Sequence, residues 1–205
     1  MAFIMVEVAL QRILQKGINN LRNDPDAFND IFSLYLSDEM KHDYGESYVD
    51  RIRQWFFTTR IPVVQSWSFS PNRIPCFSIH LSSESEDEAK AAIGDYFGET
   101  DDFTVTTGVF TVTADIAIHS DRNSDQTLWL YYIMSYIMFK EKRTAERLGI
   151  QLHTWSASDY NKESRYMAEN IWTRWVRVRC TTQNYLKDKD KEEYDVEIEV
   201  DVDNE

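Results

Sequence analysis

The chain has few of the residues that cross-link, bend or break a backbone: two cysteines, four prolines and six glycines in 205 residues. Cys76 and Cys180 are too few for the disulfide framework of a small secreted domain, and both lie in apolar, strand-like runs. We therefore expect two reduced, buried thiols and an intracellular protein. Long apolar runs are also missing. None approaches the ~20 residues that cross a bilayer, and the apolar N-terminus lacks the basic start of a signal peptide.

Basic residues are scarce relative to acidic ones, with 22 Lys and Arg against 35 Asp and Glu, a formal net charge of −13 and a pI of about 4.7. Such a surface repels nucleic acid and anionic lipid, which disfavours sequence-specific DNA binding and membrane association. The charge is uneven. Residues 192–205 contain eight acidic residues and no basic one, so this short segment carries −8 and the remainder only −5.

The motifs that usually accompany catalysis are missing as well. The glycines are scattered singly, so no glycine-rich phosphate loop exists, and there is no nucleophile elbow, Cys–His signature or His-Glu-x-x-His. An enzyme needs positioned acids, bases or nucleophiles, and no such constellation is visible. We therefore predict a protein that is not an enzyme, with no catalytic, cofactor-binding or metal-ligating residues and no cofactor.

One alternative of another class is a metal-dependent enzyme. His80 and His119 each end a predicted strand, and Asp121 follows two residues after His119. Paired strands could bring these side chains together as ligands, with an acidic residue from the loop around Glu84. The simpler interpretation is that the two histidines face solvent at strand ends, because the ligand spacing matches no metal motif.

Aromatic residues are abundant, with 6 Trp, 11 Tyr and 11 Phe among 42% hydrophobic residues, so the chain folds. We predict one α+β domain over residues 1–186, with a helical portion at 1–60 and a sheet plus a long helix at 61–186. Apolar residues recur every three or four positions in the helical portion. This spacing predicts helices over Ala2–Leu21, from Pro25 onward behind an Asn23-Asp24 cap, and over Glu46–Thr58.

The remainder of the domain alternates apolar and polar residues, which predicts a mostly antiparallel sheet packed by a long helix. The helix is expected over Thr127–Leu148, with Ser124 or Asp125 as its N-terminal cap and Gly149 at its end. Its first half is expected to be buried and its second half to be exposed to solvent. An acidic loop is expected over Glu84–Glu88, and the facing of the late Trp/Arg strand is left open. Strands are predicted over Val63–Phe69, Pro75–Leu81, Phe103–Thr107, Val109–His119, Ile150–Ser156 and Ile171–Cys180, with a kink at Gly108.

Residues 187–205 form an acidic C-terminal arm. From Tyr194 to Asp203 the arm alternates strictly, with acidic residues on one face and four apolar side chains on the other: Val196, Ile198, Val200 and Val202. This pattern fits a strand that adds to an exposed sheet edge, in its own chain or in a neighbour, and we predict these four residues as partner-binding. The alternative is a disordered acidic tail.

The order of elements over roughly residues 60–186 resembles that of the tail terminator and neck proteins of tailed bacteriophages. The resemblance is carried by the strand Ile74–Leu81, the acidic residues Glu84–Glu88, the turn Ile93-Gly94-Asp95 and the strand ending Asp115–Ser120. A long helix and a late aromatic/Arg strand follow. These proteins are small α+β subunits that form rings between head and tail.

The resemblance implies a sheet flanked by helices and assembly as a sixfold ring that caps the tail tube and docks to the head connector. Its partners would be further copies of the chain, tube or sheath proteins and the connector. Its location would be the virion, assembled in the host cytoplasm. Another neck, tube or baseplate subunit is the nearest alternative. An acidic mimic of nucleic acid that blocks a DNA-binding host factor is a further alternative, which the charge of −8 on residues 192–205 would serve.

Overall fold

The computed structural model describes residues 4–35, 42, 47–65, 74–86, 95–99, 104–121, 124–159 and 171–188. Within these ranges the chain is α+β with a mostly antiparallel sheet, as predicted. The helices are α1 (Val6–Asn23), α2 (Pro25–Tyr35), α4 (Ser47–Thr58), α5 (Ser124–Lys140) and α6 (Lys142–Arg147). The strands are β1 (Val63–Gln65), β2 (Cys76–Glu86), β3 (Asp95–Glu99), β4 (Thr104–Ser120), β5 (Ile150–Asp159) and β6 (Trp172–Asp188).

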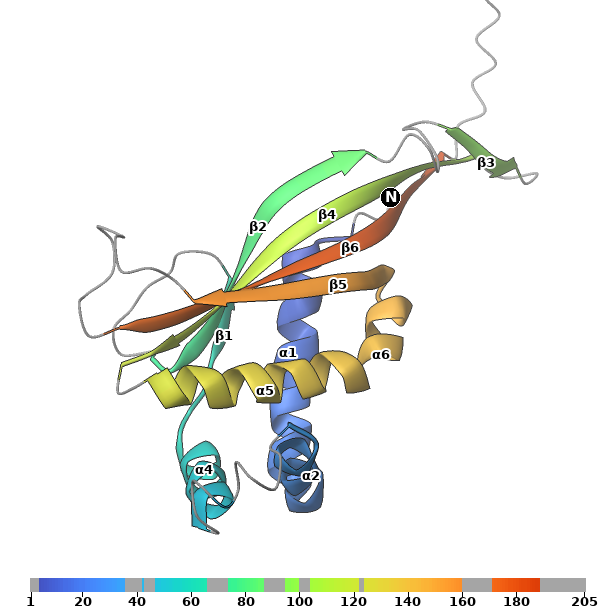
Figure 1. Ribbon diagram of the computed structural model, residues 1–205. Helices are drawn as coiled ribbons and strands as arrows, with labels where there is room; N and C mark the ends of the chain where they lie inside the picture. Colours follow the sequence, from blue (N-terminus) through green and yellow to red (C-terminus); the bar gives the residue numbers. More distant parts are fainter. Residues whose placement is uncertain are drawn as a thin grey trace, which may run out of the picture.

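The six strands form one sheet in the order β1-β2-β4-β6-β5, and β3 pairs with the beginning of β4. Among the described strands, β1 and β2 are the one parallel pair. The centre of the sheet is the pair β4 and β6, which stay in register over all 17 residues of each strand. This long ribbon continues past the helices, and β3 lies at its far end (Figure 1).

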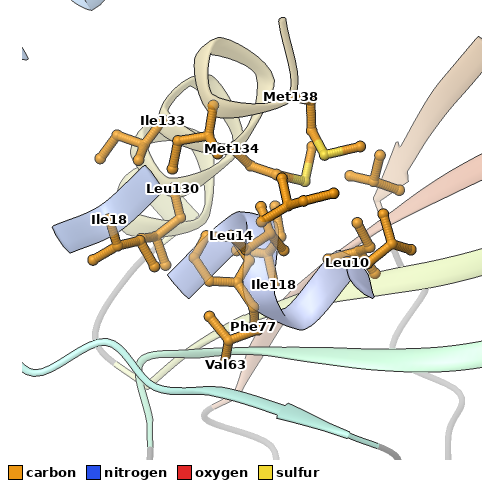
Figure 2. Packing of buried hydrophobic residues seen from close by; sticks show 14 of the residues in the cluster. Leu10, Leu14, Ile18, Val63, Phe77, Ile118, Leu130, Ile133, Met134 and Met138 are labelled. Carbon is orange, nitrogen blue, oxygen red and sulfur yellow. The ribbon is translucent and has the colours of Figure 1, made fainter. Parts of the chain in front are cut away.

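The helices lie on one side of the sheet, and α1, α5 and α6 pack against this face, called here the inner face (Figure 1). Leucine and isoleucine side chains of α1 interdigitate with α5 and with apolar side chains of β1, β2 and β4 (Figure 2). The core is therefore a helix pair on a sheet, built from fully buried residues that include Leu10, Leu14, Ile18, Phe77, Ile118, Leu130, Ile133 and Met134.

The three N-terminal helices follow their sequence pattern. In α1 every third or fourth residue is buried, and Asp24 Oδ1 accepts a hydrogen bond from the backbone N–H of Ala27, which caps α2 as predicted. Tyr48, Ile52 and Phe56 are the buried face of α4. The indole N–H of Trp129 in α5 donates to the hydroxyl of Tyr48 at 2.8 Å, which fixes α4 against α5.

The predicted continuous helix over Thr127–Leu148 is wrong. The chain breaks at Glu141 (φ −91°, ψ 12°) into α5 and α6. Glu141 is held there by hydrogen bonds from Lys16, Asn20 and Thr144, two of which come from α1. A contact with a distant helix, and not a local breaker, therefore ends α5. The predicted stop at Gly149 is confirmed, since this residue adopts the positive φ of 81° that favours glycine.

Several strands differ from their predicted bounds. The expected acidic loop is wrong at its start, because Glu84 and Glu86 lie in β2 and pair with Val112 and Phe110 of β4. The expected kink at Gly108 is also wrong, because this residue lies in the unbroken ladder opposite Asn184. β1 is described only to Gln65, and the rest of the predicted strand Val63–Phe69 lies outside the described residues.

The structure settles the facing of β6. Val176, Val178 and Cys180 point to the inner face and are buried, so Trp175, Arg177 and Arg179 point to the opposite, outer face. Cys76 and Cys180 are both buried thiols that form no disulfide, as the sequence predicts.

Candidate interaction surface

Alternate residues of β2, β4, β6 and β5 point away from the helices and form the outer face of the sheet. Many of these residues are polar. One row crosses the sheet from His80 in β2 through Asp115 in β4 and Arg177 in β6 to Ser156 in β5. Ser78 is fully buried at one end of this face, whereas Ser156 and Arg177 are exposed. The outer face therefore has a buried polar zone and an open one.

A hydrogen-bonded cluster occupies the buried zone. The hydroxyl of Ser78 lies 2.9 Å from Nε2 of His80 and 2.9 Å from Nε2 of His119. Nδ1 of His119 lies 2.9 Å from the hydroxyl of Thr173. Burial lowers the pKa of His80, although the nearby Asp115 carboxylate partly offsets this by raising it. Burial, and secondarily the neighbouring His80, lowers the pKa of His119 to about 4. Both rings are therefore neutral at pH 7.

This cluster is chemically incomplete as a nucleophilic centre within the described residues. A neutral imidazole could accept the proton of Ser78, but the ring of His119 is oriented by Thr173 and not by a carboxylate. Ser78 is also only 1% exposed, so a substrate has no approach to its hydroxyl. The arrangement satisfies buried polar groups and fixes the register of β2 on β4.

The alternative of a metal site at His80, His119 and Asp121 finds no support among the described residues. The structure brings His80 and His119 together, but around a serine hydroxyl and inside the sheet, not at solvent-facing strand ends. Asp121 lies just beyond β4 and is exposed, and Glu84 pairs with the inner-face residue Val112. Within the described ranges no three His, Cys, Asp or Glu side chains are grouped so that they could hold a metal ion.

The open zone contains an ion pair and a depression. Arg177 Nε donates to Asp115 Oδ1 at 2.9 Å, and its Nη2 donates to Oδ2 at 3.2 Å, which is a bidentate pairing. The Asp115 carboxylate raises the pKa of Arg177. These two residues, together with Trp175, Ser156 and Ser158, line an open depression of about 350 Å³.

The edge beside this depression is strand β5. Among the described strands β5 pairs with β6 alone, so its other side presents unpaired backbone groups. On the inner side of this edge, the rings of Trp155 and Phe139 pack edge to face with centroids 4.8 Å apart. Phe139 is 63% exposed, the largest value among the large hydrophobic residues described. An apolar pair thus flanks an open strand edge.

The four predicted partner-binding residues, Val196, Ile198, Val200 and Val202, lie outside the described residues. The sequence did not identify the Ser78 cluster or the Asp115–Arg177 pair, because both depend on the register of three strands. The alternation of Arg177 and Arg179 in a strand was the one available signal for a basic outer face.

Comparisons with known proteins give no family for this chain: no protein-family model matches it, and a search of the curated proteins finds no match. None of the helices in the described part is both long and apolar enough to span a bilayer.

Proposed function

We propose that the chain is a structural subunit of a bacteriophage neck or tail, and specifically a tail terminator that forms a ring on the tail tube and docks to the head connector. The observation that carries this proposal is the one-sided sheet. Helices cover its inner face, while the open zone of the outer face and the free side of β5 remain available for neighbours. Subunits of a ring need two such surfaces, because each copy contacts a copy on either side.

The charge of the chain supports this role. A ring through which DNA passes should not bind the passing phosphates, and a net charge of −13 provides repulsion in place of attraction. The long ribbon of β4 and β6 supports it as well, because it extends beyond the helices and offers surface that the core of a single copy does not use (Figure 1).

We also propose that the subunit acts without catalysis. The polar cluster most similar to catalytic machinery is the one around Ser78, and its hydroxyl and the His119 ring are completely or almost completely buried. The polar groups that line the depression of the outer face include a bidentate ion pair and two serines, which suit recognition of a protein surface.

The test is the location of the chain in virus particles. Particles of the phage that encodes the chain should contain it at a low, fixed copy number by quantitative mass spectrometry, and labelled antibody should decorate the junction of head and tail. Lysates that lack the chain should accumulate filled heads and unjoined tails, often of irregular length. Complete, infectious particles without the chain would overturn the proposal.

A further inference from the structure

The free edge of β5 has two unlike faces. On the inner side lie the half-buried Trp155 and the exposed Phe139. On the outer side β5 carries the small, exposed residues Thr154 and Ser156, which pair with Arg179 and Arg177 of β6. A strand added at this edge would therefore have an apolar surface on one side and a basic surface on the other.

The C-terminal arm has the complementary pattern. Between Tyr194 and Asp203 one set of alternate residues is entirely acidic, and the other set is Val196, Ile198, Val200 and Val202. Added beside β5, the acidic set would lie two strand spacings, about 9.6 Å, from the backbone of β6. The guanidinium group of Arg179 can reach across that distance because the intervening residue, Thr154, is small, whereas Arg177 must first leave its pair with Asp115 in β4.

Other open strand edges of the described sheet are acidic, unlike the edge of β5. The side of β2 beyond its pairing with β1 carries Glu84 and Glu86, and β3 begins and ends with Asp95 and Glu99. Residues 192–205, with eight acidic side chains and no basic one, are repelled from both.

We propose that residues 194–203 of a second copy add as a strand to the free edge of β5, with their acidic side chains over Arg177 and Arg179 and their valine and isoleucine side chains over Trp155 and Phe139. This inference rests on the proposed role as a ring subunit, and it names the contact that joins one copy to the next. Backbone hydrogen bonds hold the strand, and the two side-chain faces fix its register and orientation.

The segment that connects β6 to residue 194 is short, and this favours pairing of the arm with a second copy over pairing with β5 of its own chain. Thr182 of β6 pairs with Ile150, the first residue of β5, and β6 continues for six further residues to Asp188. To return to Ile150 the chain would cover about 20 Å along the sheet and about 10 Å across it. The six steps from Asp188 to Tyr194 extend to roughly 21 Å at most, which leaves no length for a turn.

The experiment reverses charge on each partner within the full chain. The arm-reversed variant is Glu197→Lys with Glu199→Lys and Asp201→Lys, and the edge-reversed variant is Arg177→Glu with Arg179→Glu. Sedimentation velocity measures self-association of each. We expect each variant alone to weaken self-association at least tenfold relative to the unmodified chain. A matched control, Arg12→Glu with Arg60→Glu, changes the same charge at two exposed arginines elsewhere and should alter it less than twofold.

The decisive sample is an equimolar mixture of the two variants. Each reversed arm then meets a reversed edge, and each native arm meets a native edge, so assembly in trans should return to at least half of the unmodified level. If the arm pairs with its own chain, mixing restores nothing. Arg179→Glu alone serves as a milder edge variant, because Arg177 also pairs with Asp115 and its replacement can disturb the sheet.

The outcomes separate this inference from the proposed function. Unmodified chain that assembles while both variants assemble equally well overturns the arm contact and leaves the ring proposal standing. Variants that dissociate without recovery in the mixture overturn pairing in trans. Unmodified chain that remains monomeric at every concentration overturns both proposals.

Discussion

A Cβ atom on Gly17 of α1 would lie 2.3 Å from Cγ2 of Ile137 in α5, so these two residues set how closely the two core helices cross. Alanine at position 17 would gain helix propensity of about 1 kcal/mol but would force this contact apart. We expect Gly17→Ala to lower the free energy of unfolding by about 1–3 kcal/mol, measured by urea denaturation. Arg12→Ala replaces an exposed residue of the same helix and should change the free energy of unfolding by less than about 0.5 kcal/mol, as surface substitutions usually do. Equal or higher stability of Gly17→Ala would contradict the close crossing.

The buried histidines predict a loss of stability in weak acid. The folded-state pKa of His119 is about 4, below its ordinary value of 6.5, because of burial and the neighbouring His80. Between these two values the unfolded chain binds a proton that the folded chain does not, so stability is complete above pH 6.5 and falls as the pH drops toward 4. The loss from His119 should be on the order of 3 kcal/mol, and the lowered pKa of His80 acts in the same direction.

The measurement is thermal unfolding at a series of pH values from 8 to 4. The control is His119→Gln, which cannot titrate and should show a shallower decline between about pH 6.5 and 4 even if its stability at pH 7 is lower. If the variant and the unmodified chain decline with the same slope, His119 is not the residue responsible.

Glu141 joins the break between α5 and α6 to α1. Its carboxylate accepts hydrogen bonds from Lys16 at 2.9 Å and Asn20 at 3.3 Å. Burial alone would raise the pKa of Glu141, but the hydrogen bonds from Thr144 and Lys16 outweigh it and lower the pKa. We expect Glu141→Gln to reduce the free energy of unfolding at pH 7 by roughly 1–2 kcal/mol, because a charged acceptor is lost. Glu146→Gln, on the exposed side of α6, is the control and should have little effect. Similar small effects of both substitutions would mean that the carboxylate does not hold the break.

The two thiols should be unreactive in the folded chain. Cys76 and Cys180 are buried, and burial raises the pKa of the Cys180 thiol to about 11, with a further contribution from Glu84. Titration with Ellman's reagent at pH 8 should therefore detect almost no thiol under native conditions and two after unfolding in guanidinium chloride. Rapid reaction of a thiol in the native chain would contradict the burial of these strands.

The helices were largely predictable because the residues that specify each helix lie within it or next to it in the sequence. The three- and four-residue spacing of Leu10, Ile13 and Leu14 matches the buried face of α1, and the Asp24 cap lies where the sequence places it. The break at Glu141 was not predictable, since Lys140, Glu141 and Lys142 are all compatible with a helix. The break depends on Lys16 and Asn20, more than a hundred positions away in the chain.

The sheet and the surface were less predictable for the same reason. Glu84 and Glu86 have the composition of a loop, yet pairing with β4 extends the strand through them. The two histidines were expected to face solvent at strand ends, with an approach to each other only as the alternative, and the position of Ser78 between them follows from the register of β2 on β4. Which face of β6 is buried depends on the packing of Val176 and Val178 under the helices, a tertiary choice that the alternation of Trp and Arg leaves open.

We propose above all that the chain is a building block that assembles with copies of itself. Negative-stain electron microscopy of the purified full-length chain, over a range of protein concentrations with native mass spectrometry of the same samples, tests it most directly. We expect closed rings with a central opening and a single dominant copy number of six. Monomers at every concentration, with no ring in any field, would contradict it.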